Sequence, residues 1–381
     1  MPAPENCRGR WGSRPRHCPK TAGLRLKLSF RSILPNPTRS ILHRTISLNN
    51  MSKTQIGVIG LGKMGAGLAR QAAEKGYPVM GLDIHPRPDL ETENLHVVAS
   101  IEELVKQLQR PRKVFLYIPA GAAVDGLIAQ LQPHLEEGDI IVDGGNSYWG
   151  DSIRRAARLR EQGLYFIDCG TSGGPGGART GACYMVGGED AAVGQLKDFF
   201  VETSVPDGFL HTGPAGTGHY VKLVHNGIEF GMLQAIGEGM GLLTHFREKL
   251  DISAILGLWN NGSVVRSWLV ELMKKMYDEE GGFNVPSYIE DTGEVNWLVA
   301  DALHMEVPIP VITQSVMQLF TSRDKEPTWA KSIAMMRHGF GGHPYGEDKG
   351  LQRERQYGRV GEYEMPPETG ERANQEPGSH Q

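Results

Sequence analysis

Cysteine and long apolar runs are both scarce in this sequence of 381 residues. The four cysteines, Cys7, Cys18, Cys169 and Cys183, lack metal-site spacing and are too few for a disulfide scaffold. No apolar run reaches the ~18–20 residues that span a bilayer. These absences argue against a disulfide-rich secreted domain and a transmembrane chain. We therefore expect a reduced intracellular setting, the cytoplasm by default, with neither a metal nor a membrane partner.

Charge is distributed unevenly along the chain. Residues 1–50 hold ten of the 40 Lys and Arg residues but one of the 44 Asp and Glu residues, so residues 51–381 carry a formal charge of −13. An acidic body argues against nucleic acid as the main partner. The basic leader, which we expect to be disordered, has the composition of an organellar targeting segment. Because Met51 directly precedes the first expected strand, a start assigned too far upstream is the favoured explanation of the leader.

Short apolar runs alternate with helical patterns up to about residue 213. Residues 63–75 have a helical pattern between the first two runs. Strands that alternate with helices indicate a Rossmann-like, doubly wound parallel sheet, hence an α/β domain. The runs expected to form strands are 55–60, 77–83, 114–118, 140–143 and 164–168.

The pattern changes near residues 213–218. A long helical pattern follows over residues 219–246, and further helical patterns continue to about residue 336 without comparable strand-like runs. We therefore predict an all-α C-terminal domain that carries catalysis and dimerisation. The expected organisation is a leader at 1–50, a dinucleotide-binding domain at 51–215, the all-α domain at 216–343 and a mobile polar tail at 344–381.

A glycine-rich segment follows the first expected strand and opens the first expected helix. It reads Gly60-Leu61-Gly62-Lys63-Met64-Gly65, which is the G-x-G-x-x-G pattern of dinucleotide-binding turns. Gly60 permits the tight turn, Gly62 lets a pyrophosphate approach the backbone, and Gly65 lets helix and strand pack closely. We assign Gly60, Leu61, Gly62, Met64 and Gly65 to the cofactor site, because the helix N-terminus attracts phosphate.

The second expected strand ends in an acidic residue. Asp83 lies 23 residues after Gly60, close to the spacing of the acid that binds the cofactor ribose. A carboxylate there accepts from the ribose hydroxyls and repels a 2′-phosphate, and the nearest arginine is Arg87. NAD is therefore favoured and NADP remains possible. The alternative is a solvated carboxylate at a strand end.

Two more loops follow expected strands, at the sheet edge where α/β proteins bind ligands. Ile118, Pro119 and Ala120 can line the nicotinamide half of the cleft, although a plain Pro-Gly turn explains them equally well. The run Asp143-Gly144-Gly145-Asn146-Ser147 combines a tight backbone with an amide that both donates and accepts. Asn146 is therefore a candidate contact for both cofactor and substrate.

The helical pattern that begins near residue 219 carries a polar stripe. Lys222, His225, Asn226 and Glu229 fall at i, i+3, i+4 and i+7, which is one face of a helix. A lysine whose pKa is lowered by burial can act as a base, and a glutamate in the same cleft can act as an acid. A solvent-facing Lys–Glu ladder has the same spacing and remains the alternative. Four apolar residues point in other directions and can pack: Val221, Leu223, Val224 and Ile228.

These motifs, in this order over residues 55–346, resemble the 6-phosphogluconate dehydrogenases of the short, NAD-preferring type, within the β-hydroxyacid dehydrogenase superfamily. The resemblance implies that Lys222 is the general base and Glu229 the general acid. It also places an arginine and a histidine of the C-terminal segment 337–343 in the active site of the partner subunit. The substrate contacts that it implies are Asn146, Ser172, Gly173, Gly174, His225, Asn226, Arg337 and His343.

The sequence departs from the family pattern at the phosphate site. Phe230 replaces the tyrosine whose hydroxyl contacts phosphate in the commonest form. Asn296-Trp297-Leu298 stands where the long form has Lys-Trp-Thr, and Leu319 aligns with the long form's phosphate arginine. Arg323 lies one turn later and is the expected substitute.

The resemblance implies the oxidative decarboxylation of 6-phosphogluconate to ribulose 5-phosphate and CO2, as in the pentose phosphate pathway and gluconate utilisation. It also implies a homodimer or homotetramer with composite active sites. Two alternatives are another β-hydroxyacid dehydrogenase, of the 3-hydroxyisobutyrate type, and a non-catalytic nucleotide sensor. Such dehydrogenases usually lack the His225/Glu229 pair and the segment 337–343, whose presence here favours the decarboxylating enzyme.

Overall fold

The computed structural model describes residues 53–357. The basic leader, which we expect to be disordered, and residues 358–381 of the expected mobile tail lie outside the described residues. The segment that we expect to be a mobile polar tail contains a helix, α13 (Lys349–Tyr357). Among residues 53–357, no helix is long and apolar enough to cross a bilayer.

Eight strands form one sheet in the order β3-β2-β1-β4-β5-β6-β7-β8. Every neighbouring pair is parallel except β6 and β7, which run antiparallel. The predicted fold class is confirmed, with one antiparallel step that the sequence did not indicate. The strands are β1 (Ile56–Ile59), β2 (Val79–Leu82), β3 (Leu95–Val97), β4 (Lys113–Leu116), β5 (Ile140–Asp143), β6 (Tyr165–Ser172), β7 (Ala182–Gly187) and β8 (Ser204–Gly213).

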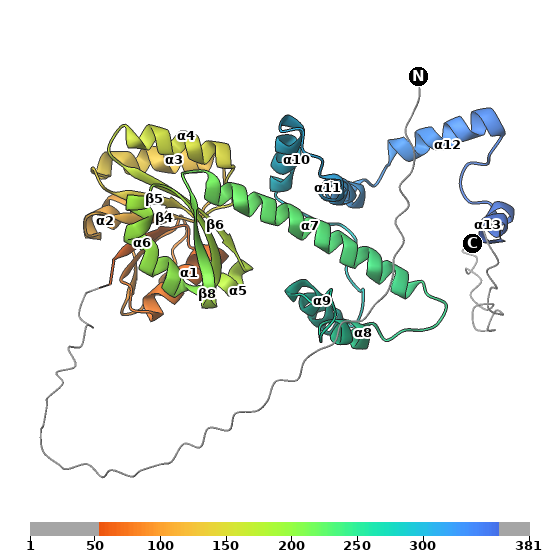
Figure 1. Ribbon diagram of the computed structural model, residues 1–381, viewed down its shortest axis with the longest axis horizontal. Coiled ribbons are helices and arrows are strands. Elements are labelled where there is room, and N and C mark those ends of the chain that lie inside the picture. The colour runs from red at the N-terminus through yellow and green to blue at the C-terminus, as the bar shows by residue number, and fades with distance from the viewer. Residues whose placement is uncertain (1–52, 358–381) are drawn as a thin grey trace, which may run out of the picture. The chain divides into compact units, whose positions relative to one another are not determined.

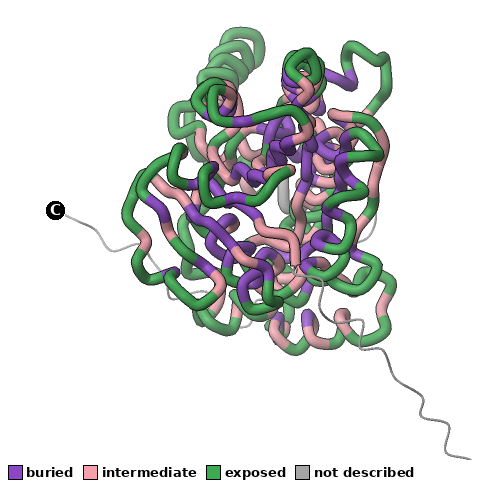
Figure 2. Tube along the Cα trace, turned by 90° about the vertical axis from the view of Figure 1, so that its left-hand side faces the viewer, coloured by how far each residue is buried: buried purple, intermediate pink, exposed green. Residues whose placement is uncertain are grey.

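Helices cover both faces of this sheet (Figure 1). Helices α1 and α6 pack on one face and α2, α3 and α4 on the other. Every residue of β1, β4 and β5 is buried, as expected for central parallel strands. Figure 2 shows buried positions in the interior of the described part and exposed positions along its outer turns. The helical segments here are α1 (Lys63–Glu74), α2 (Ile101–Gln107), α3 (Ala122–Leu131), α4 (Trp149–Arg160), α5 (Gly174–Thr180), α6 (Asp190–Thr203) and the 3-10 turns η1 (Pro88–Leu90) and η2 (Gln132–His134).

Within the described residues, the chain after residue 213 is helical. Its longest element is α7, where we predicted a helix over residues 219–246. The helices are α7 (Thr217–Thr244), α8 (Ile252–Trp259), α9 (Trp268–Glu279), α10 (Glu294–His304), α11 (Pro310–Arg323), α12 (Thr328–Gly341) and α13. The expected all-α character of this part is confirmed.

The first turn of α7 is anchored directly on the sheet. Asp168, fully buried in β6, accepts hydrogen bonds from the backbone N–H groups of Gly216 at 2.6 Å and His219 at 2.8 Å. A Cβ atom at Gly218 would come within 2.5 Å of the carbonyl oxygens of Asp168 and Met185. Only a glycine fits there, so the absence of a side chain lets α7 approach β6 and β7 closely.

Candidate functional site

The glycine-rich turn between β1 and α1 has the geometry of a phosphate-binding loop. Gly60 has φ +92°, and a Cβ there would come within 2.3 Å of the Tyr117 carbonyl oxygen. A Cβ at Gly65 would come within 1.9 Å of the Gly60 carbonyl oxygen, whereas nothing lies within 4 Å of one at Gly62. The tight turn and the close packing therefore belong to Gly60 and Gly65, and the open space at Gly62 fits a bound pyrophosphate.

Asp83 follows β2 and faces the same turn. Its Oδ2 accepts from the backbone N–H of Leu61 at 2.6 Å, and its Oδ1 accepts from that of His85 at 2.9 Å. The guanidinium of Arg87 donates to the Leu61 carbonyl oxygen and pairs with both carboxylate oxygens of Asp89 at 2.9 Å. The arginine nearest to the ribose position is thus already engaged by Asp89.

A cavity of about 960 Å³ lies beyond the carboxyl ends of β4 and β5, against α7. It brings together loops that we predicted to bind cofactor and substrate with the polar stripe of α7. Its predicted site residues are Met64, Ile118, Asn146, Ser172, Gly173, Gly174, Lys222, His225, Asn226 and Glu229. The turn residues Gly60, Leu61, Gly62 and Gly65, with Asp83, Pro119 and Ala120, do not line it.

The polar stripe of α7 forms a hydrogen-bonded chain. The amine of Lys222 donates to Oδ1 of Asn226, and Nδ1 of His225 lies 3.1 Å from the same oxygen. Nε2 of His225 lies 3.1 Å from the hydroxyl of Ser172, and Nδ1 lies 3.8 Å from the Glu229 carboxylate. The four side chains therefore face the cavity together, and the solvent-facing ladder is not what the structure shows. Of the apolar residues expected to pack, Leu223 is buried, whereas Val221 and Ile228 are exposed.

Burial of the amine lowers the pKa of Lys222 from its ordinary value, because desolvation disfavours the charged form. The negative charges of Glu229 and Glu294 act in the opposite direction and raise the pKa. The close packing has a simple origin, since a Cβ at Gly170 of β6 would come within 2.4 Å of the Lys222 Cβ. A lowered pKa favours the neutral amine that a general base requires.

A buried arginine connects the loop after β4 with the loop after β5. Arg155 of α4 is 1 % exposed and donates to the Gly121 carbonyl oxygen at 3.0 Å and to both oxygens of Asp125, at 3.0 and 3.1 Å. It also lies 3.5 Å from Oδ2 of Asp143, which in turn accepts from the Ser147 hydroxyl at 2.8 Å. Arg155 thus connects the loop after β4 to the loop that carries Asn146.

Three residues predicted to contact the substrate, Arg323, Arg337 and His343, do not line the cavity of this chain. Arg323 donates to the Ile289 carbonyl oxygen at 2.6 Å and to Asp291 at 2.5 Å. Arg337 is exposed on α12, and His343 lies beyond the end of that helix, where its carbonyl oxygen accepts from the His338 ring at 2.8 Å. Helix α12 ends at Gly341, so no helix continues through both Arg337 and His343.

Several cavity residues were not predicted from the sequence. Glu294, at the start of α10, is 9 % exposed and accepts from the Asn226 amide at 3.2 Å. Tyr117, Trp268 and Leu272 add aromatic and apolar surface. A carboxylate at the first position of a helix is common, so no local signal separates Glu294 from an ordinary first-turn acid.

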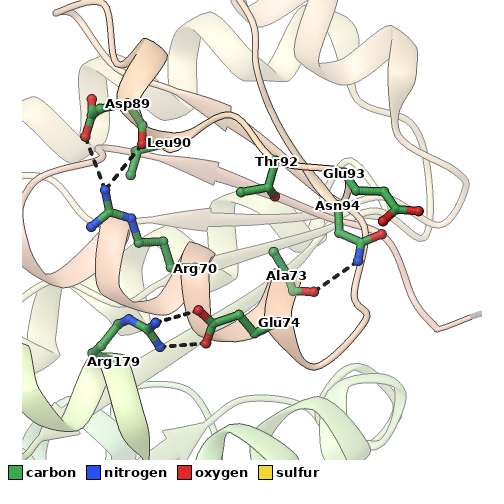
Figure 3. A pocket seen from close by; sticks show the side chains of 9 residues that line it. All are labelled: Arg70, Ala73, Glu74, Asp89, Leu90, Thr92, Glu93, Asn94 and Arg179. Atoms are coloured by element: carbon green, nitrogen blue, oxygen red, sulfur yellow. Dashed lines mark hydrogen bonds and ion pairs between the residues drawn. The ribbon is translucent and has the colours of Figure 1, made fainter.

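A second pocket, of about 490 Å³, shares no residue with the cavity (Figure 3). Two ion pairs cross it, Arg70 with Asp89 and a bidentate pair of Arg179 with Glu74 at 2.5 and 2.7 Å. These pairs link α1 to η1 and α5, so four of the five charged side chains that line the pocket are paired with one another. Its lining is Arg70, Ala73, Glu74, Asp89, Leu90, Thr92, Glu93, Asn94 and Arg179.

Comparison with known proteins assigns both halves of the chain. Residues 55–208 match the NAD-binding domain of 6-phosphogluconate dehydrogenase, and residues 218–350 match its C-terminal domain. Both matches fall within the described fold, and their junction lies at the start of α7. Among residues 53–357, no group of three or more His, Cys, Asp or Glu side chains is arranged to hold a metal ion.

Relatives of full length support the same assignment. A putative 6-phosphogluconate dehydrogenase of Bacillus subtilis is 37% identical over 76% of this chain and 98% of its own. The NAD(+)-dependent, decarboxylating 6-phosphogluconate dehydrogenase of Haloferax volcanii is 40% identical over 76% and 97%. The structure of the Plasmodium falciparum 6-phosphogluconate dehydrogenase superposes with a TM-score of 0.66 at 29% identity, over 77% of this chain and 66% of that one. With its cofactor turn, its α7 stripe and both domains accounted for, this chain belongs to the 6-phosphogluconate dehydrogenase family.

Proposed function

We propose that this chain oxidises and decarboxylates 6-phosphogluconate to ribulose 5-phosphate and CO2 with a nicotinamide cofactor. The observation that carries the proposal is the placement of Lys222 and Glu229 on one face of α7, in one cavity with Asn146 and Ser172. Relatives at 37–40% identity are named for this activity, and the Plasmodium falciparum enzyme was solved with NADP+ and with 6-phosphogluconate.

Lys222 performs the proton transfers on the substrate oxygen. Its neutral amine takes the proton of the C3 hydroxyl, and the nicotinamide supplies the acceptor for the hydride that leaves C3. In the resulting 3-keto acid, the bond between C1 and C2 breaks and CO2 departs. The protonated Lys222 then returns a proton to the developing enolate oxygen, because an ammonium group stabilises that charge.

Glu229 completes the reaction on the opposite side of the enediol. Its carboxyl group protonates the carbon that has lost CO2, which becomes C1 of ribulose 5-phosphate, while Lys222 takes back the proton of the neighbouring enol hydroxyl and leaves the C2 ketone. His225, 3.8 Å from Glu229 and 3.1 Å from Ser172, lies between the acid and the loop that we assign to the substrate carboxylate. An acid and a base on one helix therefore serve the two ends of one reaction.

We propose NAD as the preferred cofactor. The Asp83 carboxylate uses one acceptor site on each oxygen for Leu61 and His85, which leaves further lone pairs for ribose hydroxyls. Arg87, the nearest cation for a 2′-phosphate, is paired with Asp89. The NAD(+)-dependent Haloferax volcanii relative fits this preference, although an NADP(+)-dependent Bacillus subtilis relative is also 40% identical.

We also propose a homodimer, or a larger assembly of dimers, with composite active sites. Helix α12 contains no buried residue and carries the exposed apolar side chains Trp329, Met335, Met336 and Phe340. An apolar surface of this kind favours association. Arg337 lies on the same helix. When α12 docks on a partner subunit, the guanidinium of Arg337 can therefore reach the partner's cavity and bind the substrate phosphate there.

The test is an assay of the full chain with 6-phosphogluconate and either NAD or NADP. We expect NADH absorbance and CO2 to appear in equal amounts, with a higher kcat/KM for NAD. The same assay with 3-hydroxyisobutyrate serves as the control substrate. Reduction of the cofactor without CO2, or turnover of 3-hydroxyisobutyrate alone, would contradict the proposal, and a folded protein that binds NAD without turnover would indicate a sensor.

A further inference from the structure

Glu294 is a cavity carboxylate whose two oxygens are both engaged. It is the first residue of α10 and is 9 % exposed. Its Oε1 accepts from Nδ2 of Asn226 at 3.2 Å, and its Oε2 accepts from the hydroxyl of Thr292 at 2.5 Å. With a partner on each oxygen, the carboxylate is held in one orientation.

This orientation determines which way the Asn226 amide faces. A carboxylate only accepts hydrogen bonds, so the NH2 group of Asn226 must point to Glu294 and its oxygen must point away. That oxygen accepts from the amine of Lys222 and from Nδ1 of His225. In the neutral His225 ring, Nε2 is then the acceptor for the Ser172 hydroxyl, 3.1 Å away. One buried carboxylate thus sets the amide orientation and the imidazole tautomer.

Glu294 also contributes to the charge around Lys222. The titratable groups that face the amine are Glu229 and His225 on α7, Glu294 on α10 and Cys183 on β7. Glu229 changes its protonation in the proposed reaction, whereas Glu294 takes no part in the chemistry. The Glu294 charge raises the pKa of Lys222 and so opposes the effect of burial.

We propose that Glu294 is a positioning residue that acts through Asn226 to hold the amine of Lys222 in place, and that its carboxylate charge acts on this amine without taking part in the chemistry. The inference rests on the proposed function for the reaction that Lys222 performs. The hydrogen bonds and the charge that carry it are properties of the chain alone.

The charge is tested with Glu294→Gln, which preserves the shape of the side chain. We expect the amine of Lys222 to lose a proton more readily in this variant, because a neighbouring negative charge is gone. In competitive labelling of the full chain with acetic anhydride, read by mass spectrometry at neutral pH, Lys222 should react about threefold faster or more. The acid limb of kcat/KM should move to lower pH. An unchanged labelling rate and an unchanged acid limb in the folded variant would overturn the role of the charge.

Asp301→Asn is the matched control, because Asp301 is a second buried carboxylate on α10. It is 7 % exposed and accepts from the Tyr148 hydroxyl at 3.2 Å and the Trp149 indole at 2.7 Å, away from Lys222. We expect this variant to lose stability without a change in the Lys222 labelling rate or in the acid limb. An equal acceleration of labelling in both variants would show a general loosening of α10 and contradict the specific role of Glu294.

The positioning is tested separately with Glu294→Asp, which keeps the charge but shortens the side chain. We expect kcat to fall about tenfold while KM for NAD and the acid limb stay near wild type, since the carboxylate no longer reaches Asn226. A full kcat in Glu294→Asp would contradict the positioning role. This variant still tests the proposal if Glu294→Gln fails to fold. Labelling requires no turnover, so absent NADH formation in the wild type would count against the proposed function only.

Discussion

The sheet domain and the helical part of this chain differ in how completely each buries its own apolar surface. Both faces of the sheet carry an extended core that includes the fully buried Phe115, Phe199 and Phe200. Among the described residues of the helical part, the two clusters contain four buried residues each, and Phe340 on α12 is 76 % exposed. The cofactor turn is therefore supported within one chain, whereas the helical part presents surface that a second copy can bury.

Lys222 lies where the two regions meet, because α7 packs against β6 and β7 from the sheet and against α10 and α11. Replacing it with Met removes the proposed base while filling a similar volume. We expect the rate of hydride transfer to fall by about 10²–10⁴-fold with NAD affinity retained. Single-turnover NADH formation and a fluorescence titration with NADH measure the two quantities. Near-normal turnover would refute the assignment of Lys222.

Subunit complementation asks whether the helical part completes a neighbouring site. Lys222→Met and Arg337→Ala chains should each be inactive alone. After subunit exchange, a mixed dimer contains one site with both residues intact, so about a quarter of the wild-type activity should return. Demonstrated exchange without recovered activity would place both residues in the site of a single chain. The helical part would then, like the sheet domain, form its part of the site without a second copy.

Substitution of Arg155 tests how much the buried ion pairs within the sheet domain stabilise it. Arg155→Met leaves the buried Asp143 carboxylate without its cation, and we expect the free energy of unfolding to fall by about 3–5 kcal/mol. Arg154→Met is the control, since this neighbour is exposed and its pairs with Asp125 and Asp151 should contribute less than about 1 kcal/mol. Urea unfolding followed by circular dichroism measures both variants. Equal losses would mean that the buried network does not stabilise the domain.

The smallest effect is expected at Asp83, on the cofactor side. Asp83→Ala removes the acceptor of the ribose hydroxyls and of the Leu61 N–H, so kcat/KM for NAD should fall by about 10–100-fold. The NADP value should change less, so the preference for NAD relaxes. Initial rates with both cofactors give the ratio, with Asp83→Asn as a control that retains an acceptor. A wild-type enzyme that already prefers NADP would contradict the role of Asp83.

Local patterns in the sequence identified most of the sheet and the polar face of α7. The G-x-G-x-x-G turn and the i, i+3, i+4, i+7 stripe are short-range signals, and residues 140–143 form β5 as predicted. Strands β3, β7 and β8 were missed. In β8, Pro206 and Gly208 oppose a strand assignment, yet an edge strand tolerates both.

Long-range features of the site had no comparable signal. The contact of Glu294 with Asn226 joins residues 68 positions apart, so no local pattern announces it. The expected role of Arg323 at the phosphate rested on alignment with the family, while its bonds to Ile289 and Asp291 depend on the packing of α11. The sequence indicated which polar side chains belong to the site, whereas tertiary contacts determine their hydrogen-bond partners.

The anchoring of α7 by Asp168 ties the backbone of the proposed catalytic lysine directly to the sheet. Its two backbone hydrogen bonds hold the start of the helix against β6, and Lys222 lies just over one turn beyond that start. The sheet therefore fixes the backbone at Lys222, while the orientation of the amine still depends on Asn226 and on Glu294 of α10. In a chimera that joins residues up to about 231 to the helices of a relative, Lys222 would keep its backbone position, and its amine would keep its orientation only where the relative supplies a carboxylate at the place of Glu294.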